Sequence, residues 1–129
     1  MANILIVEDE AHIARVLAMW LTRHSHEVLE AANGHEALDI LARETVHLVI
    51  TDMNMPGLDG LGLIQAIRED RSLTLPILLL TARCDQAALV TRLKPYDVGI
   101  IPKPFVPSRL VSDIEELLGA ARIGRPACR

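Results

Sequence analysis

The chain has 129 residues, and half of them are hydrophobic, which is enough to fill the core of one domain of ordinary size. Its formal net charge of −4 lacks the basic excess of nucleic-acid-binding domains, so we expect no direct contact with nucleic acid. No apolar run reaches the roughly 18–20 residues of a membrane span, no secretory signal opens the chain, and two cysteines give no disulfide framework, so a cytoplasmic domain is expected.

Apolar runs alternate with segments of helical periodicity, beginning at the N-terminus. Ile4–Val7 predicts a buried strand, and the next apolar residues follow the spacing of an amphipathic helix: Ile13, Val16, Leu17, Trp20 and Leu21. Glu27–Ala31 predicts a shorter and more polar strand. Asn33–Gly34 is a turn and helix-cap signal ahead of a second helix, whose apolar residues are Ala37, Leu38 and Leu41.

The second half of the chain repeats this alternation. His47–Thr51 predicts a third strand, Gly60–Glu69 a third helix, and Pro76–Thr81 a fourth, apolar strand. Pro95 should end a fourth helix, because the residue before a proline disfavours the α region; the apolar positions of that helix are Leu89, Val90 and Leu93. Val98–Pro102 predicts a fifth strand, and a last helix carries an apolar stripe of Leu110, Ile114, Leu117 and Leu118.

Five strand-then-helix units predict an α/β domain with a parallel sheet covered on both faces. The pattern favours a flavodoxin-like, doubly wound three-layer sandwich with strand order 2-1-3-4-5. Glu27–Ala31 and the proline-bearing Val98–Pro102 are expected at the edges of the sheet. Residues 1–119 would form this domain. Residues 120–129, which follow the end of the apolar periodicity, would form a C-terminal tail.

Carboxylates follow two of the predicted central strands. Glu8 and Asp9 close the first and Asp52 closes the third, and in this fold the carboxyl ends of strands one and three border the crevice. At about 4 Å and an effective dielectric of about 20, each pair of like charges costs on the order of 4 kcal/mol. A divalent cation would remove this cost. Ligands that are all oxygen select Mg²⁺, with Mn²⁺ as an alternative, over Zn²⁺.

Two further residues end predicted strands at the same edge. Thr81 can donate a hydroxyl hydrogen bond to a phosphoryl oxygen, and Lys103 can place an ammonium on another. With a metal and Asp52 as a carboxylate nucleophile, they predict a phosphoryl-transfer site. Each residue also has a structural explanation: Glu8 and Asp9 as a solvated strand end before a helix, Thr81 as an ordinary strand-end residue, and Lys103 as a surface charge.

Four motifs, in this order, carry a resemblance to a known family: Val7–Glu10, Asp52–Gly60, Leu80–Ala82 and Lys103–Phe105. Together they resemble the receiver domain of two-component response regulators, and the resemblance extends from about Asn3 to Leu118. It implies that the metal ligands are Glu8, Asp9, Asp52 and the backbone carbonyl of Asn54, and that the phosphoryl contacts are Thr81 and Lys103. It also implies a cis peptide bond before Pro104.

The resemblance further implies a signalling function. Asp52 would accept a phosphoryl group from the phosphohistidine of a sensor histidine kinase or phosphotransfer protein. The domain would promote its own phosphorylation and dephosphorylation without being an enzyme for a separate substrate. Its helix 4–strand 5–helix 5 face would then switch and control a downstream effector protein or a fused output domain. A homodimer is left open, and no membrane contact is implied.

The chain departs from the family pattern on the output side. The position three residues before Lys103 is usually Tyr or Phe, whose rotamer follows the switch threonine; here it is Ile100, which has no hydroxyl and less reach. The segment Lys94–Gly99 is also bulkier and stiffer than the small residues usual there. The Thr81–Ile100 pair is therefore expected to relay the signal differently.

Three other functions are compatible with parts of this sequence. An aspartyl phosphohydrolase usually needs a second Asp two residues after the first, where this chain has Asn54. A flavin-binding flavodoxin relative would need a Ser/Thr/Gly phosphate loop after the first strand, where this chain has Glu8–Glu10. A receiver truncated from a longer DNA-binding transcriptional regulator would have the same motifs, and this alternative stays open.

Overall fold

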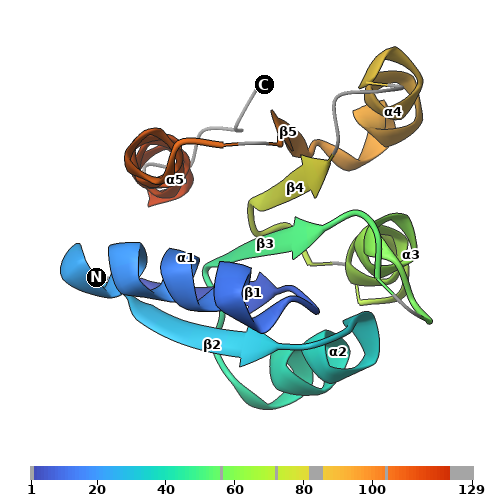
Figure 1. Cartoon of the computed structure of the whole chain (residues 1–129). Helices are drawn as coiled ribbons and strands as arrows, with labels where there is room; N and C mark the ends of the chain where they lie inside the picture. Colours follow the sequence, from blue (N-terminus) through green and yellow to red (C-terminus); the bar gives the residue numbers. More distant parts are fainter. Residues whose placement is uncertain (1, 56, 72, 82–85, 104, 123–129) are drawn as a thin grey trace.

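A twisted parallel sheet forms the centre of the computed structural model, which describes residues 2–55, 57–71, 73–81, 86–103 and 105–122 (Figure 1). Over these ranges it has five strands: β1 Asn3–Val7, β2 Glu27–Ala31, β3 Leu48–Asp52, β4 Ile77–Thr81 and β5 Gly99–Pro102. Their order is β2-β1-β3-β4-β5, and every neighbouring pair is parallel. The predicted flavodoxin-like order is confirmed, with β2 and β5 at the edges.

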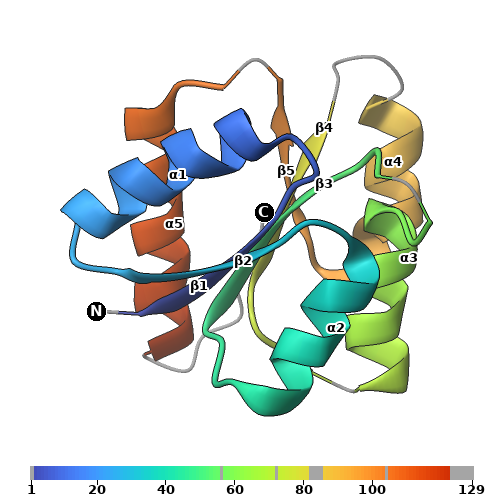
Figure 2. The same cartoon turned by 60° about the horizontal axis from the view of Figure 1, so that its bottom comes forward.

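Helices cover both faces of the sheet. In the described part of the chain these are α1 Ala11–Arg23, α2 Gly34–Arg43, α3 Gly60–Gln65, α4 Gln86–Leu93 and α5 Pro107–Arg122. Figure 2 shows α1 and α5 together on one side and α2, α3 and α4 on the other. Among the helices within the described ranges, none has both the length and the apolar character needed to cross a bilayer.

The boundaries differ from the predictions by small amounts that have local causes. β3 begins and ends one residue later than predicted, so that Asp52 is still within the ladder and pairs with Leu80. α4 ends at Leu93 and continues as a 3-10 turn over Lys94–Tyr96, as expected from Pro95. α5 runs to Arg122, past the last residue of the predicted apolar stripe. The division at residue 119 stays a prediction, and residues 123–129 lie outside the described part.

Two hydrophobic clusters flank the sheet. One joins β1, β3 and β4 to α1 and α5, and the other joins the opposite face of the sheet to α2, α3 and α4. The strands contribute alternate residues to the two clusters, as a sheet buried on both faces requires. Two apolar positions of the predicted helices are exposed: Val90 of α4, at 55%, and Val16 of α1, at 43%. The buried stripe of α1 consists of Ala14, Leu17 and Leu21, which rotates Val16 toward solvent.

The predicted cap of α2 is confirmed. The Asn33 side chain accepts a hydrogen bond from the Glu36 amide at 2.9 Å, and the Glu36 side chain accepts one from the Ala32 amide at 2.9 Å. Two amides at the helix start are thereby satisfied. The cap fixes the direction in which α2 leaves the sheet.

A second polar arrangement ties the end of the third helical segment to the turn before β5. After α3 the helix continues as a π-helix, Ala66–Asp70, in which Arg68 is half-buried. The Arg68 guanidinium donates to four main-chain carbonyls, those of Leu73, Leu75, Tyr96 and Asp97, at 2.8, 2.7, 2.8 and 3.4 Å. The Tyr96 hydroxyl donates to Glu69. We call Arg68, Glu69, Tyr96 and Asp97 the Arg68 junction.

Candidate metal centre

The candidate site lies at the carboxyl ends of β1 and β3, where the main chain is fixed by hydrogen bonds. The Glu8 amide donates to the Ala31 carbonyl at 3.0 Å, which extends the β1–β2 ladder by one residue. The Met53 amide donates to the Leu80 carbonyl at 2.9 Å and does the same for β3 and β4. The acidic residues therefore leave the sheet from well-defined backbone positions.

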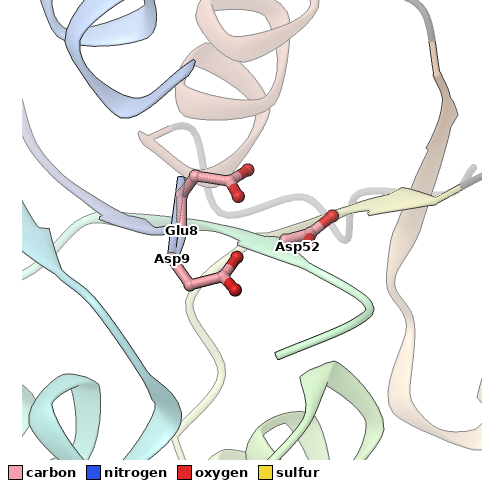
Figure 3. Close-up of side chains that lie close together, drawn as sticks. All are labelled: Glu8, Asp9 and Asp52. Carbon is pink, nitrogen blue, oxygen red and sulfur yellow. The ribbon is translucent and has the colours of Figure 1, made fainter. Parts of the chain in front are cut away.

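Three carboxylates come together at this edge, as Figure 3 shows. Glu8, Asp9 and Asp52 each offer one oxygen, and the three oxygens lie within 4.8 Å of one another. Glu8 and Asp52 are buried, whereas Asp9 is exposed. We call these three residues, together with Lys103, the acidic edge. The arrangement has one open side, formed by Asp9, and two acids that are largely removed from water.

Glu8 is buried beside a second carboxylate, and its pKa is raised. Burial, followed by the charge of Asp52, raises the pKa of Glu8 to about 7, although the Glu10 amide and Lys103 act in the opposite direction. One Glu8 oxygen accepts the Glu10 amide at 3.2 Å. The other, Oε1, is buried and has no hydrogen-bond partner among the described residues. A buried acceptor without a donor is costly, so this oxygen is available for a ligand.

Lys103 supplies positive charge within the acidic edge. Its ammonium lies 2.5 Å from Asp52 Oδ1 and 4.0 Å from Glu8 Oε1. Burial alone would lower the pKa of Lys103, but the hydrogen bond and charge of Asp52, with Glu8 and Glu10, outweigh it and raise that pKa. One ammonium among three carboxylates still leaves the edge with a net negative charge.

The donor set fits a hard divalent cation. All three donors are carboxylate oxygens, which suits Mg²⁺. Glu8 Oε1 has no hydrogen bond among the described residues, and the Lys103 ammonium is 4.0 Å from it. A bound cation would also favour the ionised form of Glu8, whose pKa is raised first by burial and then by the charge of Asp52. The choice of Mg²⁺ as the ion stays a prediction.

The other predicted site residues lie on neighbouring elements. Thr81 is buried at the end of β4, and its carbonyl accepts the Lys103 amide at 2.7 Å, so the two residues are neighbours. Asn54 is exposed in the turn after β3. Ile100 is half-buried in β5, pairs with Leu79 and packs in the cluster with α2, α3 and α4. Pro104, expected to follow a cis bond, lies outside the described residues.

Two residues beneath the acidic edge were not singled out from the sequence. Thr51 is fully buried, and its hydroxyl donates to the Asp52 carbonyl at 3.0 Å. Gly60 opens α3, and its amide donates to the Met53 carbonyl at 2.9 Å. The available signal was a hydroxyl residue within an apolar central strand, next to the candidate nucleophile.

Comparison with known proteins gives a consistent result. A family model described as "Response regulator receiver domain" matches residues 4–115. The chain is 38% identical over 120 residues to a "Chemotaxis protein CheY homolog" of Campylobacter jejuni, covering 91% of this chain and 92% of the relative. It is 40% identical over 116 residues to a "Probable transcriptional regulator ycf27" of Porphyridium aerugineum, covering 90% of this chain but 48% of the relative. The chain thus spans about half the length of such regulators.

Solved structures agree with this. The response regulator protein TrrA from Thermotoga maritima, determined in complex with Mg²⁺–BeF, superposes with a TM-score of 0.79 at 32% sequence identity. The match covers 91% of this chain and 99% of that chain. The similarity therefore extends over nearly the whole of both molecules.

Proposed function

The chain belongs to the response regulator receiver domain family, and from this premise we propose that Asp52 accepts a phosphoryl group in an Mg²⁺-dependent reaction. One observation carries the proposal. Asp52 shares a 4.8 Å cluster of carboxylate oxygens with Glu8 and Asp9, and the Lys103 ammonium lies 2.5 Å from its Oδ1. The proposed nucleophile, the candidate cation ligands and a positive charge are therefore adjacent to one another.

The chemistry assigns a role to each residue. An Asp52 oxygen attacks phosphorus, an acyl phosphate bond forms, and the bond from phosphorus to the donor's imidazole nitrogen breaks. When bound, Mg²⁺ supplies charge that neutralises the phosphoryl oxygens. Glu8, Asp9, Asp52 and the Asn54 carbonyl would hold it. The Lys103 ammonium would move from Asp52 to a phosphoryl oxygen, and the Thr81 hydroxyl would donate to another.

The readout is proposed to pass through the neighbouring strand. Thr81 ends β4, and Ile100 lies in β5 and faces the cluster that contains α4. A shift of Thr81 toward the phosphoryl group would open space that Ile100 can fill. The face formed by α4, β5 and α5 would then bind a downstream effector or a fused output domain, either as a monomer or as a homodimer.

The phosphoryl donor is proposed to be a sensor histidine kinase or phosphotransfer protein, and this chain is proposed to act in the cytoplasm. The likeness to a chemotaxis protein over 92% of its length supports a stand-alone regulator that binds a partner protein. The likeness to transcriptional regulators about twice as long supports the second candidate, the receiver part of a DNA-binding regulator. The sequence of the complete gene distinguishes the two, because a regulator would continue into an output domain.

Intact-protein mass spectrometry with acetyl phosphate and Mg²⁺ tests the acceptor. We expect one phosphoryl adduct on the wild-type protein, and none after addition of EDTA or in Asp52→Asn. Asp39→Asn, on the exposed side of α2, is the matched control and should be phosphorylated normally. An adduct that persists in Asp52→Asn at the wild-type level would show that the acceptor is another residue.

A further inference from the structure

The buried hydroxyl of Thr51 forms a hydrogen bond to the main chain of Asp52, on the face of the sheet that α3 covers. Thr51 pairs with Leu79 of β4, and both residues face the cluster that contains α3. The Thr51 hydroxyl is fully buried and donates to the Asp52 carbonyl at 3.0 Å. Because a buried hydroxyl is costly without a partner, this hydrogen bond fixes both the Thr51 rotamer and the Asp52 carbonyl.

Gly60, the first residue of α3, packs against the main chain of Asp52 and Met53. A Cβ atom at Gly60 would lie 2.6 Å from the Asp52 carbonyl oxygen and 2.9 Å from Met53 Cα. It would also lie 2.9 Å from Leu79 Cδ1. The first two of these atoms belong to the main chain, so they cannot move aside as the end of a side chain can. The first residue of α3 therefore lies directly against the backbone of the proposed acceptor.

We propose that Thr51 and Gly60 are positioning residues for the Asp52 site. Both act on one atom, the Asp52 carbonyl oxygen, and so fix the peptide plane that follows the acceptor. That plane sets the direction of the Asp52 side chain and the course of the turn over residues 53–55, which includes the proposed Asn54 ligand. Neither residue touches the metal or the phosphoryl group. The inference rests on the proposed function, because it assigns these residues a purpose within that reaction.

Another glycine of the same helix provides a matched control. A Cβ atom at Gly62 would also meet a neighbour at 2.6 Å, but that neighbour is Leu58 Cδ1, the end of a flexible side chain. Gly60→Ala and Gly62→Ala therefore add the same methyl group to one helix at the same nearest distance. They differ in whether the acceptor's main chain must move.

The experiment measures Mg²⁺ affinity from the Asp52 amide NMR shift, phosphorylation by acetyl phosphate, and stability by urea unfolding. We expect Gly60→Ala and Thr51→Val to weaken Mg²⁺ binding about tenfold, the lower end of the effect of changes around metal ligands, and to slow phosphorylation. Thr51→Ser, which keeps the hydroxyl, should restore Mg²⁺ affinity, and Gly62→Ala should leave it within about twofold of wild type. A role in stability alone would lower the urea midpoint without this pattern.

The outcomes separate the two proposals. If Gly60→Ala and Thr51→Val bind Mg²⁺ as tightly as wild type, the positioning role is wrong, while Asp52 remains the proposed acceptor. If wild type is not phosphorylated at all, the proposed function is wrong, and the Mg²⁺ titrations still decide the positioning role. If Gly60→Ala does not fold, the comparison of Thr51→Val with Thr51→Ser decides it alone.

Discussion

At the acidic edge a buried carboxylate oxygen has no hydrogen-bond donor among the described residues, whereas at the Arg68 junction a guanidinium donates to four main-chain carbonyls. The two regions also differ in how charge is balanced. Glu8 lies near Asp52 and has a raised pKa of about 7. Burial lowers the pKa of Arg68, with Asp97 acting against this, but the guanidinium remains charged.

The two regions therefore differ in hydrogen bonding: the donors of Arg68 have acceptors, whereas one oxygen of Glu8 has no donor among the described residues. The Arg68 guanidinium donates to carbonyls of two segments. The junction therefore contributes to stability without a bound ligand. At the acidic edge, burial and then the charge of Asp52 disfavour the ionised form of Glu8, and a bound divalent cation would offset both. We therefore expect changes at the junction to alter stability without altering metal binding. Changes at the acidic edge should alter metal binding and, through Glu8, the pH dependence of stability.

The largest effect is expected at the Arg68 junction. Arg68→Met keeps the aliphatic stem but leaves the carbonyls of Leu73, Leu75 and Tyr96 without their donor, which should cost about 4 kcal/mol of unfolding free energy. The exposed Arg71→Met is the matched control and should change little. Urea unfolding measures both, and Mg²⁺ titration of the folded variant should match wild type. A loss below about 1 kcal/mol would mean that water replaces the guanidinium.

The pH dependence of stability is the next largest effect. In the unfolded chain Glu8 loses its proton near its ordinary pKa of 4.5, but in the folded chain it keeps the proton up to about pH 7. Unfolding in that window releases a proton, so stability falls as pH rises from about 4.5 to 7, by up to ~3 kcal/mol without metal. Glu8→Gln should abolish most of this fall, while Glu10→Gln, a change of an exposed neighbour, should keep it.

Thermal unfolding at a series of pH values, with EDTA and with excess Mg²⁺, tests this point. Mg²⁺ should restore the stability of wild type above pH 7, because it binds the folded state with Glu8 ionised. Glu8→Gln should respond less to Mg²⁺ at every pH. A wild-type stability that stays flat or increases between pH 5 and 7.5 in EDTA would contradict the raised pKa of Glu8.

The acidic edge could be predicted from the sequence because its signals are local. Apolar runs that end in Glu8–Asp9 and in Asp52 identify strand ends, and a parallel sheet brings carboxyl ends to one edge. The strand order followed from the alternation of strands and helices and from the polar or proline-bearing edge candidates. The residues that carry the proposed chemistry can therefore be identified from the sequence.

The Arg68 junction could not be predicted in this way. In the sequence Arg68 is one charged residue near the end of an amphipathic helix, a pattern typical of a solvated side chain. Its partners are carbonyls 5 to 29 residues away, and a carbonyl carries no signature in the sequence. The same limit applied to Thr51 and Gly60, whose importance depends on where the Asp52 carbonyl lies. Backbone partners become visible only once the fold is known.

Removing the positive charge of Lys103 from the acidic edge should have a smaller effect, and this effect should be on Mg²⁺ affinity and not on stability. The Lys103 ammonium lies 2.5 Å from Asp52 and repels a second cation, so Lys103→Met should increase Mg²⁺ affinity by about tenfold while slowing phosphorylation. Lys94→Met, the exposed counterpart, should change neither quantity. Isothermal titration with Mg²⁺ and the acetyl phosphate assay give the two values. Weaker Mg²⁺ binding in Lys103→Met would mean that Lys103 mainly orders the carboxylates.

The smallest effect is expected for removal of the Tyr96 hydroxyl, which tests the exposed part of the Arg68 junction. This hydroxyl donates to Glu69 at an exposed position, and the hydrogen bond to Glu69, with a smaller contribution from burial, raises the pKa of Tyr96. Exposed polar contacts contribute little because water competes for both groups. Tyr96→Phe should therefore unfold at the same urea concentration as wild type, whereas Arg68→Met should not.

If Tyr96→Phe proved as damaging as Arg68→Met, the junction would depend on its exposed side-chain contact and not on the half-buried guanidinium. A double-mutant cycle between Tyr96→Phe and Glu69→Gln distinguishes these cases, since it isolates the hydroxyl–carboxylate contact. We expect no measurable coupling. The stability of the junction would then come from the half-buried guanidinium and the backbone carbonyls to which it donates. At the acidic edge, by contrast, the unsatisfied oxygen is the one proposed to bind a ligand.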